Sequence, residues 1–459
     1  MYQIDFNRPV SVHFIGIGGI SMSGLAAVLL KEGFSVSGSD ARKTPLTSWL
    51  EEKGADIVYG QSADNIRPSC DVIVYTAAIH PDNPEYAEAV RRQIPMLSRA
   101  ELLGQIMKNY EMPIAVAGTH GKTTTTSMLS LILLEAGMDP TISVGGILKA
   151  IGGNIRVGSS QNFITEACEY TNSYLSLCPK VSLILNIDAD HLDFFKDIED
   201  IRHSFRLFAQ RLPEDGTLII NGSIPRLEEI TGGLACRVIT YGLPDSDYYA
   251  ADVSYSELGY GSFTLMKKDQ GACGRFQLSV PGEHNVSNAL ASLAAADVLR
   301  VSWEDARRGL LAFTGADRRF ERKGSFHGVT VIDDYAHHPT EIEATLKAAR
   351  NYPHQTLWCV FQPHTYTRTN ALMDDFARAL CLADKVILAD IYAARELNTL
   401  GVSSQTLAEK ITKRGGDAIY LPTFRAIEDY AAEHCSPGDL LITMGAGDVV
   451  TIGERLIER

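Results

Sequence analysis

Short apolar runs separated by helix-like segments organise the first part of the chain. Strands are predicted at Val10–Ile15, Phe34–Ser37, Ile57–Val58 and Val72–Tyr75, with a helix at Met22–Glu32. Apolar runs joined by helical crossovers are typical of a parallel sheet covered by helices. We therefore expect a Rossmann-like α/β domain here.

Two further blocks repeat this alternation. In the second, the strand Ile114–Ala117 leads into a helix, the strand Val181–Asn186 follows, and GEHNVSNALASLAAADVL predicts a late helix. TGADRRFERKG is then expected to form a polar, basic connector. The third block is predicted to be a second doubly wound unit. Its elements are expected at Val329–Asp333, Thr356–Gln362, Val386–Asp390 and Leu440–Thr443 (strands) and at Pro339–Ala349 (helix).

Chain length agrees with this division into blocks. A chain of 459 residues is too long for one ordinary core, and two to four domains are expected. The first boundary is predicted within Lys108–Met112, which divides the chain into domains 1–108, 109–314 and 315–459. The predicted fold is α/β throughout, with a central domain like that of P-loop ATPases between two Rossmann-like domains.

Composition narrows the class of protein. The hydrophobic share of 45% and the charged share of 21% are those of a globular protein, and the net charge of −14 argues against a general binder of nucleic acid or anionic membranes. No run of 18 or more apolar residues and no signal-peptide pattern is present, so a cytoplasmic location is expected. The eight cysteines have no paired CxxC spacing and predict reduced thiols.

The segment AVAGTHGKTTTT is the strongest local signal. A strand ends, the glycines of Gly118–Thr124 allow backbone N–H groups to turn inward, and a helix begins whose N-terminus favours anions. Lys122 is suited to the β- and γ-phosphates of a nucleotide and Thr123 to Mg²⁺. The strict GxxxxGK[ST] pattern fails because Val116 occupies its first position, so a tight turn with an exposed lysine is the alternative.

A second glycine-rich turn follows the first predicted strand. Gly16, Gly18 and Gly19 precede a helix, but Ser21 occupies the position of the third glycine of GxGxxG. Asp40 closes the next strand, where an acidic residue often meets a ribose. This arrangement suits either NAD or a UDP-sugar, and a purely structural turn is the alternative.

Two polar segments follow apolar strands in the second block. ITEACEY contains Glu166 and NIDADHLD contains His191, and both are expected near the phosphate-binding loop because parallel strands end at one edge of a sheet. A carboxylate is a normal Mg²⁺ ligand, whereas a histidine is more often structural. The neighbouring Cys168 is interpreted as a small packing residue.

The third block concentrates Asp, His, Tyr and Arg in IDDYAHHPTE and FQPHTYTRT, both after predicted strands. Such residues suit a ribose, a carboxylate or an amine, and Arg368 is able to bind a carboxylate through two parallel hydrogen bonds. Taken singly, His337, His338 and His364 are equally typical of solvated or capped loop residues.

In this order the motifs resemble those of the Mur ligases, and within that family the alanine-adding branch. The resemblance spans nearly the whole chain and rests on GIGGISMSGLA, SGSD, TAAIHPDNPE, LSRAELL, GTHGKTTTT, GGN, EACEY, NIDADHLD, GEHNVSNALA, ADRRFE, DDYAHHPTE, QPHTYTRT and GAGD.

The resemblance implies a role for each domain. The first would bind UDP-N-acetylmuramate through Gly16, Gly18, Gly19, Ser21, Asp40 and His80. ATP would contact Gly118, Thr119, His120, Gly121, Lys122, Thr123, Thr124, His284, Asn285, Asn288, Arg319 and Asp334. L-alanine would lie near Tyr335, His337, His364 and Arg368. Mg²⁺, with Mn²⁺ as a substitute, would be held by Thr123, Glu166 and His191, and the catalytic set would be Lys122, Glu166 and His191.

The implied reaction has two stages. The muramate carboxylate attacks the γ-phosphate of ATP to give an acyl phosphate, and the amine of alanine then displaces phosphate. The protein's contribution would be positioning and the neutralisation of charge. The implied partners are these small molecules alone, with no nucleic acid and no membrane insertion, and the implied protein is a monomer or weak homodimer.

The chain departs from the family pattern at three places. Thr365 stands where an arginine is common, Cys168 changes the usual EADE, and 203–206 lacks the lysine that several sister ligases carbamylate. The absence of this lysine favours the alanine-adding branch.

Three rival functions remain. The nearest rival is the branch that attaches a recovered tripeptide to UDP-N-acetylmuramate. An NAD-dependent dehydrogenase and a non-catalytic nucleotide-gated binding protein are more remote.

Overall fold

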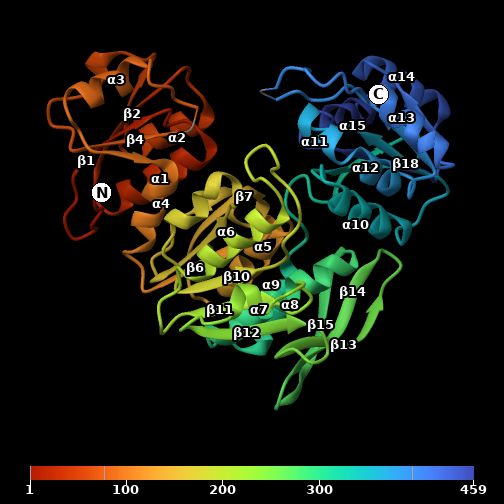
Figure 1. Cartoon of the computed structure of the whole chain (residues 1–459), viewed down its shortest axis with the longest axis horizontal. Helices are drawn as coiled ribbons and strands as arrows, with labels where there is room; N and C mark the ends of the chain where they lie inside the picture. Colours follow the sequence, from red (N-terminus) through yellow and green to blue (C-terminus); the bar gives the residue numbers. More distant parts are fainter. Residues whose placement is uncertain (1, 77, 395) are drawn as a thin grey trace.

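The computed structural model describes residues 2–76, 78–394 and 396–459. Three sheets follow one another along the chain, and each is covered by helices, so the fold is a three-domain α/β architecture. In Figure 1 the N-terminal domain (red) and the C-terminal domain (blue) both lie against the central domain.

The N-terminal sheet has five parallel strands in the order β3-β2-β1-β4-β5. Ile15 at the end of β1 is in register with Ser39 on one side and Tyr75 on the other, so the following glycine-rich turn opens where the strand order reverses. Its elements are β1 (Ser11–Ile15), α1 (Ile20–Lys31), β2 (Ser35–Asp40), α2 (Pro45–Glu52), β3 (Asp56–Tyr59), η1 (Ala63–Asn65), β4 (Val72–Tyr75), α3 (Pro84–Arg91), β5 (Met96–Ser98) and α4 (Arg99–Met107).

The central sheet has ten strands in the order β15-β14-β13-β12-β11-β10-β6-β9-β7-β8. Ala117 at the end of β6 is in register with Ala167 of β9 and Ile184 of β10, so the loops after these three strands meet at one edge. The first elements are β6 (Met112–Ala117), α5 (Lys122–Glu135), β7 (Thr141–Leu148), η2 (Lys149–Ile151), β8 (Gly153–Arg156), β9 (Asn162–Ala167), η3 (Tyr170–Ser176) and β10 (Val181–Ile184). The others are α6 (Ile198–Ala209), β11 (Thr217–Asn221), α7 (Glu228–Thr231), β12 (Arg237–Gly242), β13 (Tyr248–Tyr255), β14 (Tyr260–Lys267), β15 (Gly271–Pro281), α8 (Glu283–Val298) and α9 (Trp303–Ala312).

The C-terminal sheet has six strands in the order β16-β17-β21-β18-β19-β20, parallel except for β16. The strands are β16 (Glu321–Phe326), β17 (Val329–Asp334), β18 (Leu357–Phe361), β19 (Lys385–Leu388), β20 (Ala418–Tyr420) and β21 (Leu440–Met444). The helices are α10 (Pro339–Arg350), α11 (Tyr366–Ala371), α12 (Met373–Leu380), α13 (Ser404–Lys413), α14 (Phe424–His434) and α15 (Val450–Ile457).

The predicted fold class is confirmed, with two local differences. The predicted connector was wrong in part, because residues from Glu321 onward form β16, which pairs antiparallel with β17. The central sheet also carries an antiparallel extension, β13–β15, beyond its parallel part. None of the helices in the described part of the chain is both long and apolar enough to cross a bilayer.

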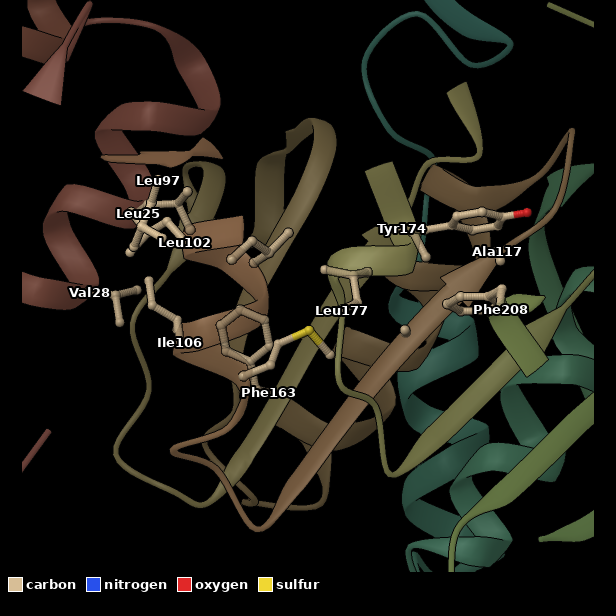
Figure 2. Packing of buried hydrophobic residues seen from close by; sticks show 14 of the residues in the cluster. Leu25, Val28, Leu97, Leu102, Ile106, Ala117, Phe163, Tyr174, Leu177 and Phe208 are labelled. Atoms are coloured by element: carbon tan, nitrogen blue, oxygen red, sulfur yellow. The ribbon is translucent and has the colours of Figure 1, made fainter. Parts of the chain in front are cut away.

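One hydrophobic cluster joins the first two domains. Leu102 and Ile106 of α4 belong to the same buried cluster as Val28 of α1 and Phe163 and Phe208 of the central domain, as Figure 2 shows. Helix α4 is therefore shared between two sheets. The clusters of the C-terminal domain contain residues of that domain alone.

Gly104 lets α4 lie directly against the central domain. A Cβ atom at this position would be 1.9 Å from the carbonyl oxygen of Ser176 in η3. Contact with a backbone atom cannot be relieved by a side-chain rotation, so the helix itself would have to move.

We expect Gly104→Ala to lower the free energy of unfolding by about 1–3 kcal/mol, as overpacking of a tight contact does. Urea denaturation measures the change. The matched control is Gly153→Ala, because a Cβ there meets no atom within 4 Å. Equal stability of the two variants would contradict a close α4 contact.

Candidate active site

The phosphate-binding loop joins β6 to α5. Gly118 and Gly121 have φ angles of +145° and +84°, which side-chain-bearing residues rarely adopt. A Cβ at Gly118 would lie 2.9 Å from Leu185 Cβ, and one at Gly121 would lie 2.7 Å from Asn288 Oδ1. Glycine is therefore required at both positions, because the backbone conformation disfavours other residues and there is no room for a Cβ atom.

The loop is fixed to the end of β10 by hydrogen bonds. Asn186 Oδ1 accepts from the backbone N–H of His120 at 2.8 Å, and Asn186 Nδ2 donates to the carbonyl of His120 at 3.0 Å. Thr119 Oγ1 accepts from the N–H of Asp188 at 2.9 Å. These contacts fix the conformation of the loop and thereby position the first turn of α5, which follows it.

Lys122, the first residue of α5, has its ammonium at the loop. Nζ donates to the carbonyls of Gly118 (2.5 Å) and Thr119 (3.0 Å) and to Glu169 Oε2 (3.0 Å). Burial opposes the charge, but Glu169 outweighs burial and raises the pKa of Lys122. The alternative of an exposed lysine is wrong, since the Lys122 side chain is 15% exposed.

A cleft between the central and C-terminal domains lies beside this loop. Eight of the predicted ATP-binding residues line it: His120, Gly121, Thr124, His284, Asn285, Asn288, Arg319 and Asp334. Apolar walls come from Val280, Phe313 and Phe320. The polar end of the cleft, at the phosphate-binding loop, suits the phosphates of a nucleotide, and the apolar end suits its base.

Burial shifts the pKa values of two groups in this cleft. It lowers the pKa of His284 to about 4, with Arg319 adding to the effect, so the imidazole is neutral at pH 7. It raises the pKa of Asp334 to about 6, while this carboxylate accepts the N–H groups of Phe320 and Ala336, each at 2.8 Å. Asp334 thus fixes the backbone at the start of the C-terminal domain.

His120 connects the two domains. Its Nε2 lies 3.1 Å from Asp188 Oδ2 of the central domain, and its Nδ1 lies 3.2 Å from Glu341 Oε1 of α10. Burial opposes protonation, but the two carboxylates outweigh it and raise the pKa of His120 to about 9. A protonated His120 therefore holds two carboxylates of different domains together at neutral pH.

The predicted metal ligands lie around the same edge of the sheet. Glu166 Oε1 accepts from the N–H of Gly145 at 2.5 Å, and His191, with φ of +53°, has Nε2 3.8 Å from Glu169 Oε1. Thr123 is buried in the first turn of α5. Carboxylate and hydroxyl oxygens fit Mg²⁺, and an imidazole fits it less well. Residues 2–76, 78–394 and 396–459 contain no group of three or more His, Cys, Asp or Glu side chains able to hold a metal.

A second pocket, at the contact between the loop after β10 and α11, contains two of the predicted alanine-site residues, His364 and Arg368. Arg368 Nε and Nη2 donate to Asp190 Oδ1 at 3.0 and 2.9 Å, and Nη1 donates to His364 Nδ1 at 3.0 Å. Burial and the nearby guanidinium lower the pKa of His364 to about 4, consistent with a neutral acceptor.

The other two predicted alanine-site residues lie beside this pocket. The His337 ring is 5.7 Å from the His364 ring, and burial lowers its pKa to about 4. The Tyr335 ring lies under Arg318 and Arg319, at 4.9 and 5.2 Å. His338, for which a solvated or capped loop residue was the alternative to a ligand, is buried and not solvated. Its Nδ1 accepts from the N–H of Thr340 at the start of α10, and its Nε2 contacts the carbonyl of Ala189.

The N-terminal loop opens toward a further pocket shared with the central domain. Ser21 lines that pocket together with Glu166 and Cys168. Asp40 Oδ2 accepts from the N–H of Gly18 at 2.8 Å, so this carboxylate supports the loop itself. His80 is exposed in the turn after β4 and is not among the residues that line this pocket. The interpretation of Cys168 as a packing residue was wrong, because its side chain is exposed to the pocket.

Several residues of the site lie within the quoted motifs, but no local pattern assigns them a partner. Asp190 pairs with Arg368, 178 residues away, and Glu341 pairs with His120 of the central domain. Asp188 pairs with His120 within its own domain. Glu169 is the second glutamate of EACEY, and the sequence alone does not distinguish its role from that of Glu166.

A phosphate-binding loop, a nucleotide cleft between domains and an adjacent pocket with Arg368 define a three-domain nucleotide-binding enzyme of the α/β class. Family models agree: the Mur ligase family, catalytic domain, matches residues 11–111; the Mur ligase middle domain matches 116–296; and the Mur ligase, glutamate ligase domain, matches 318–447. The chain belongs to the Mur ligase family.

Individual relatives are similar over the whole chain. A protein of Agathobacter rectalis named UDP-N-acetylmuramate–L-alanine ligase is 58% identical over 460 residues, covering 100% of both chains. The crystal structure of the UDP-N-acetylmuramate–alanine ligase of Thermotoga maritima matches with a TM-score of 0.79 at 28% identity, covering 98% of this chain and 99% of that one. A murein peptide ligase of Psychrobacter arcticus matches with a TM-score of 0.70 at 26% identity, covering 98% of both chains.

The raised pKa of His120 predicts a pH-dependent contribution to stability. A group whose pKa is raised in the folded state stabilises it below its unfolded pKa, near 6.5, and loses that effect as pH rises through about 9. The stability difference between wild type and His120→Gln should therefore shrink by up to about 3 kcal/mol between pH 6 and pH 10. Urea denaturation across this range measures it.

The control is His434→Gln, since His434 is an exposed residue near the end of α14. A wild-type advantage over His120→Gln that stays constant across the pH range would contradict a protonated bridge.

Proposed function

We propose that the protein ligates L-alanine to the carboxylate of UDP-N-acetylmuramate with cleavage of ATP, giving UDP-N-acetylmuramoyl-L-alanine, ADP and phosphate, a step of bacterial peptidoglycan synthesis. The observation that carries this proposal is 58% identity, over the full length of both chains, to a UDP-N-acetylmuramate–L-alanine ligase. The pockets described above have the chemistry that the three substrates need.

The domains divide these substrates between them. With boundaries at 1–108, 109–314 and 315–459, each sheet lies within one domain. The first binds the UDP-sugar at its glycine-rich loop, and the second binds the phosphates of ATP at the loop before α5. The third closes the adenine cleft and supplies Arg368 to the amino acid. The reaction uses cytoplasmic ATP, so we assign the protein to that compartment.

Lys122 is the central catalytic cation in this proposal. Its ammonium is held at the phosphate-binding loop, where it counters the charge on the transferring phosphoryl group. Glu169 keeps it protonated and oriented. Because the loop excludes side chains at both glycines, its N–H groups approach the phosphates closely.

Mg²⁺, or Mn²⁺ in its place, would be held by Thr123, Glu166 and His191, with water and phosphate oxygens completing its coordination. When bound, the metal neutralises phosphate charge. The oxygen donors of Thr123 and Glu166 support this assignment more strongly than the imidazole does.

Arg368 is well placed to bind the carboxylate of alanine. Of its five N–H bonds, two donate to Asp190 and one to His364. The remaining two face no protein acceptor within hydrogen-bonding distance among the described residues. A substrate carboxylate is the natural partner for them.

The tripeptide-attaching ligases are the competing assignment. The solved murein peptide ligase has the same three-domain fold, but its TM-score and identity to this chain are lower than those of the alanine ligase of Thermotoga maritima. A dehydrogenase would need no phosphate-binding loop before α5, and a simple binding protein would need no Arg368 pocket.

Release of phosphate tests the function directly. With ATP, Mg²⁺ and UDP-N-acetylmuramate present, L-alanine should support phosphate release far better than the tripeptide, with glycine and L-serine as further arms. Faster release with the tripeptide would assign the protein to the recycling branch.

Lys122→Ala should turn over at least about 100-fold more slowly than wild type in the same assay, comparable to the loss of one transition-state donor.

Replacing Arg368 tests the amino-acid site. Arg368→Ala should weaken apparent alanine affinity by about 30- to 1000-fold, equivalent to about 2–4 kcal/mol, while KM values for ATP and UDP-N-acetylmuramate change little. Arg368→Lys should restore part of it, because a point charge lacks the planar fork.

Loss of Arg368 also leaves Asp190 buried without its cation, which lowers stability. The double variant Arg368→Ala/Asp190→Asn removes that charge and separates the two effects: stability should recover while alanine KM stays high. Normal alanine KM in Arg368→Ala would refute the assignment.

A further inference from the structure

Every nitrogen of the Arg318 guanidinium donates a hydrogen bond to the protein. Nε donates to Asp333 Oδ2 at 2.9 Å, Nη1 to the carbonyl of Gly447 at 3.0 Å and Nη2 to the carbonyl of Gly445 at 2.7 Å. The residue lies between α9 and β16 with a φ of +60°, a conformation that is costly for a residue with a side chain. A guanidinium bound in this way has its planar fork directed at the protein, so Arg318 holds neighbouring segments and not a ligand.

Tyr335, one of the residues predicted to lie near alanine, is held by Arg318 through both its main chain and its ring. The Tyr335 N–H donates to the carbonyl of Arg318 at 2.7 Å, and the guanidinium carbon lies 4.9 Å from the ring centroid. The Tyr335 ring in turn meets the His337 ring edge-on at 5.4 Å. Because a cation is attracted to an aromatic face, the guanidinium fixes the orientation of the Tyr335 ring relative to His337.

The turn GAGD at 445–448 is the second segment that Arg318 holds. Two carbonyls of this turn accept from the guanidinium, so the turn is tied to the connector before β16. A Cβ atom at Gly447 would lie 2.9 Å from Cδ2 of Tyr392, so the backbone of the turn packs directly against this aromatic ring. The turn therefore limits the positions that the Tyr392 ring is able to take.

Tyr392 connects the turn to the pocket that contains His364 and Arg368. Its N–H donates to the carbonyl of Pro363 at 2.8 Å, and its carbonyl accepts from the N–H of Thr365 at 2.9 Å. His364, the residue between these two, stacks its ring on that of Tyr392, with the centroids 5.7 Å and the planes 14° apart. Because His364 Nδ1 accepts from Arg368, the position of the His364 ring affects that of the Arg368 guanidinium.

We propose that Arg318 is a positioning residue of the amino-acid site. It fixes Tyr335 directly, and it fixes His364 through the GAGD turn and Tyr392. The inference rests on the proposed function, which assigns the pocket of His364 and Arg368 to alanine. A purely structural role, in which Arg318 only joins β17 to β21, would instead affect stability and all three substrates alike.

Arg318→Lys tests the proposal. Lysine keeps a positive charge beside the fully buried Asp333, but its ammonium lacks the planar fork that reaches two carbonyls at once. Alanine KM should rise at least about 10-fold, because misplaced binding groups weaken the contact with an oriented substrate. KM values for ATP and UDP-N-acetylmuramate should stay within about two-fold of wild type. Unchanged alanine KM, or an equal rise for all three substrates, would overturn the proposal.

A second variant covers the case in which Arg318→Lys does not fold. Arg318→Met/Asp333→Asn removes the buried ion pair as a unit and leaves no unpaired charge. The same rise in alanine KM is expected, and the same two outcomes would overturn the proposal.

Hydroxylamine separates the amino-acid site from the first stage of the reaction. Its nitrogen attacks the acyl carbon of the acyl phosphate, the bond to the phosphate oxygen breaks, and phosphate leaves with the released proton, giving a hydroxamate. Hydroxylamine has no carboxylate for Arg368 to bind. Phosphate release with ATP, UDP-N-acetylmuramate and hydroxylamine should therefore be as fast in Arg318→Lys as in wild type. A comparable loss with hydroxylamine and with alanine would assign Arg318 a purely structural role.

Tyr392 provides an independent test of the second route. Tyr392→Leu removes the ring that stacks on His364 and should raise alanine KM at least about 5-fold, whereas Tyr392→Phe keeps the ring and should not. Tyr392 is 39% exposed, so both variants should fold. A wild-type alanine KM in Tyr392→Leu would overturn the route through the GAGD turn. Arg455→Lys is the control, since Arg455 is exposed on α15 and pairs with Glu428; its three KM values should match wild type.

The outcome is separable from that of the proposed function. Wild type that releases phosphate with alanine, beside an Arg318→Lys variant with normal alanine KM, would reject only the role of Arg318. Wild type that releases phosphate with hydroxylamine but not with alanine would reject the assignment of alanine, whatever the variants do.

Discussion

The close approach of backbone at the phosphate-binding loop is the constraint on which the rest of the site depends. Gly118 packs against Leu185 after β10, and Gly121 packs against Asn288 of α8. No side chain fits at either position, so β6, β10 and α8 are held in one arrangement. That arrangement directs Lys122 to the loop and aligns the ends of three strands, from which the acidic and histidine residues of the site project.

The two interfaces of the central domain differ in kind. The N-terminal domain shares a buried apolar cluster with it through α4, and Gly104 allows backbone contact there. The C-terminal domain meets it around the site through polar contacts, which include His120 with Glu341 and Arg368 with Asp190. The first two domains are therefore joined by a shared apolar cluster, whereas the third is held to the central domain by ion pairs.

The sequence predicted the parts of the structure that depend on local pattern. The strand Val72–Tyr75 was predicted with its observed limits, because a short apolar run between turns has one interpretation. The strand β16 was missed because Glu321–Gly324 is polar and pairs at the edge of a sheet. The ATP-cleft residues followed from ordered motifs. The pairings of Asp188 and Glu341 with His120 and of Asp190 with Arg368 did not, although all three acidic residues lie in quoted motifs, because contacts between residues far apart in the chain leave no spacing to detect.

The charged character of the third domain's attachment has a mechanical consequence. Separating the first two domains would expose apolar surface to water, at a free-energy cost that grows with area. Separating the third near the site exchanges ion pairs for hydration, and such an exchange is close to balanced. A hinge of this kind opens at small cost, and salt weakens its buried pairs only slightly while the domains are closed. The same contacts that assemble the nucleotide cleft thus allow ADP and the finished product to leave it.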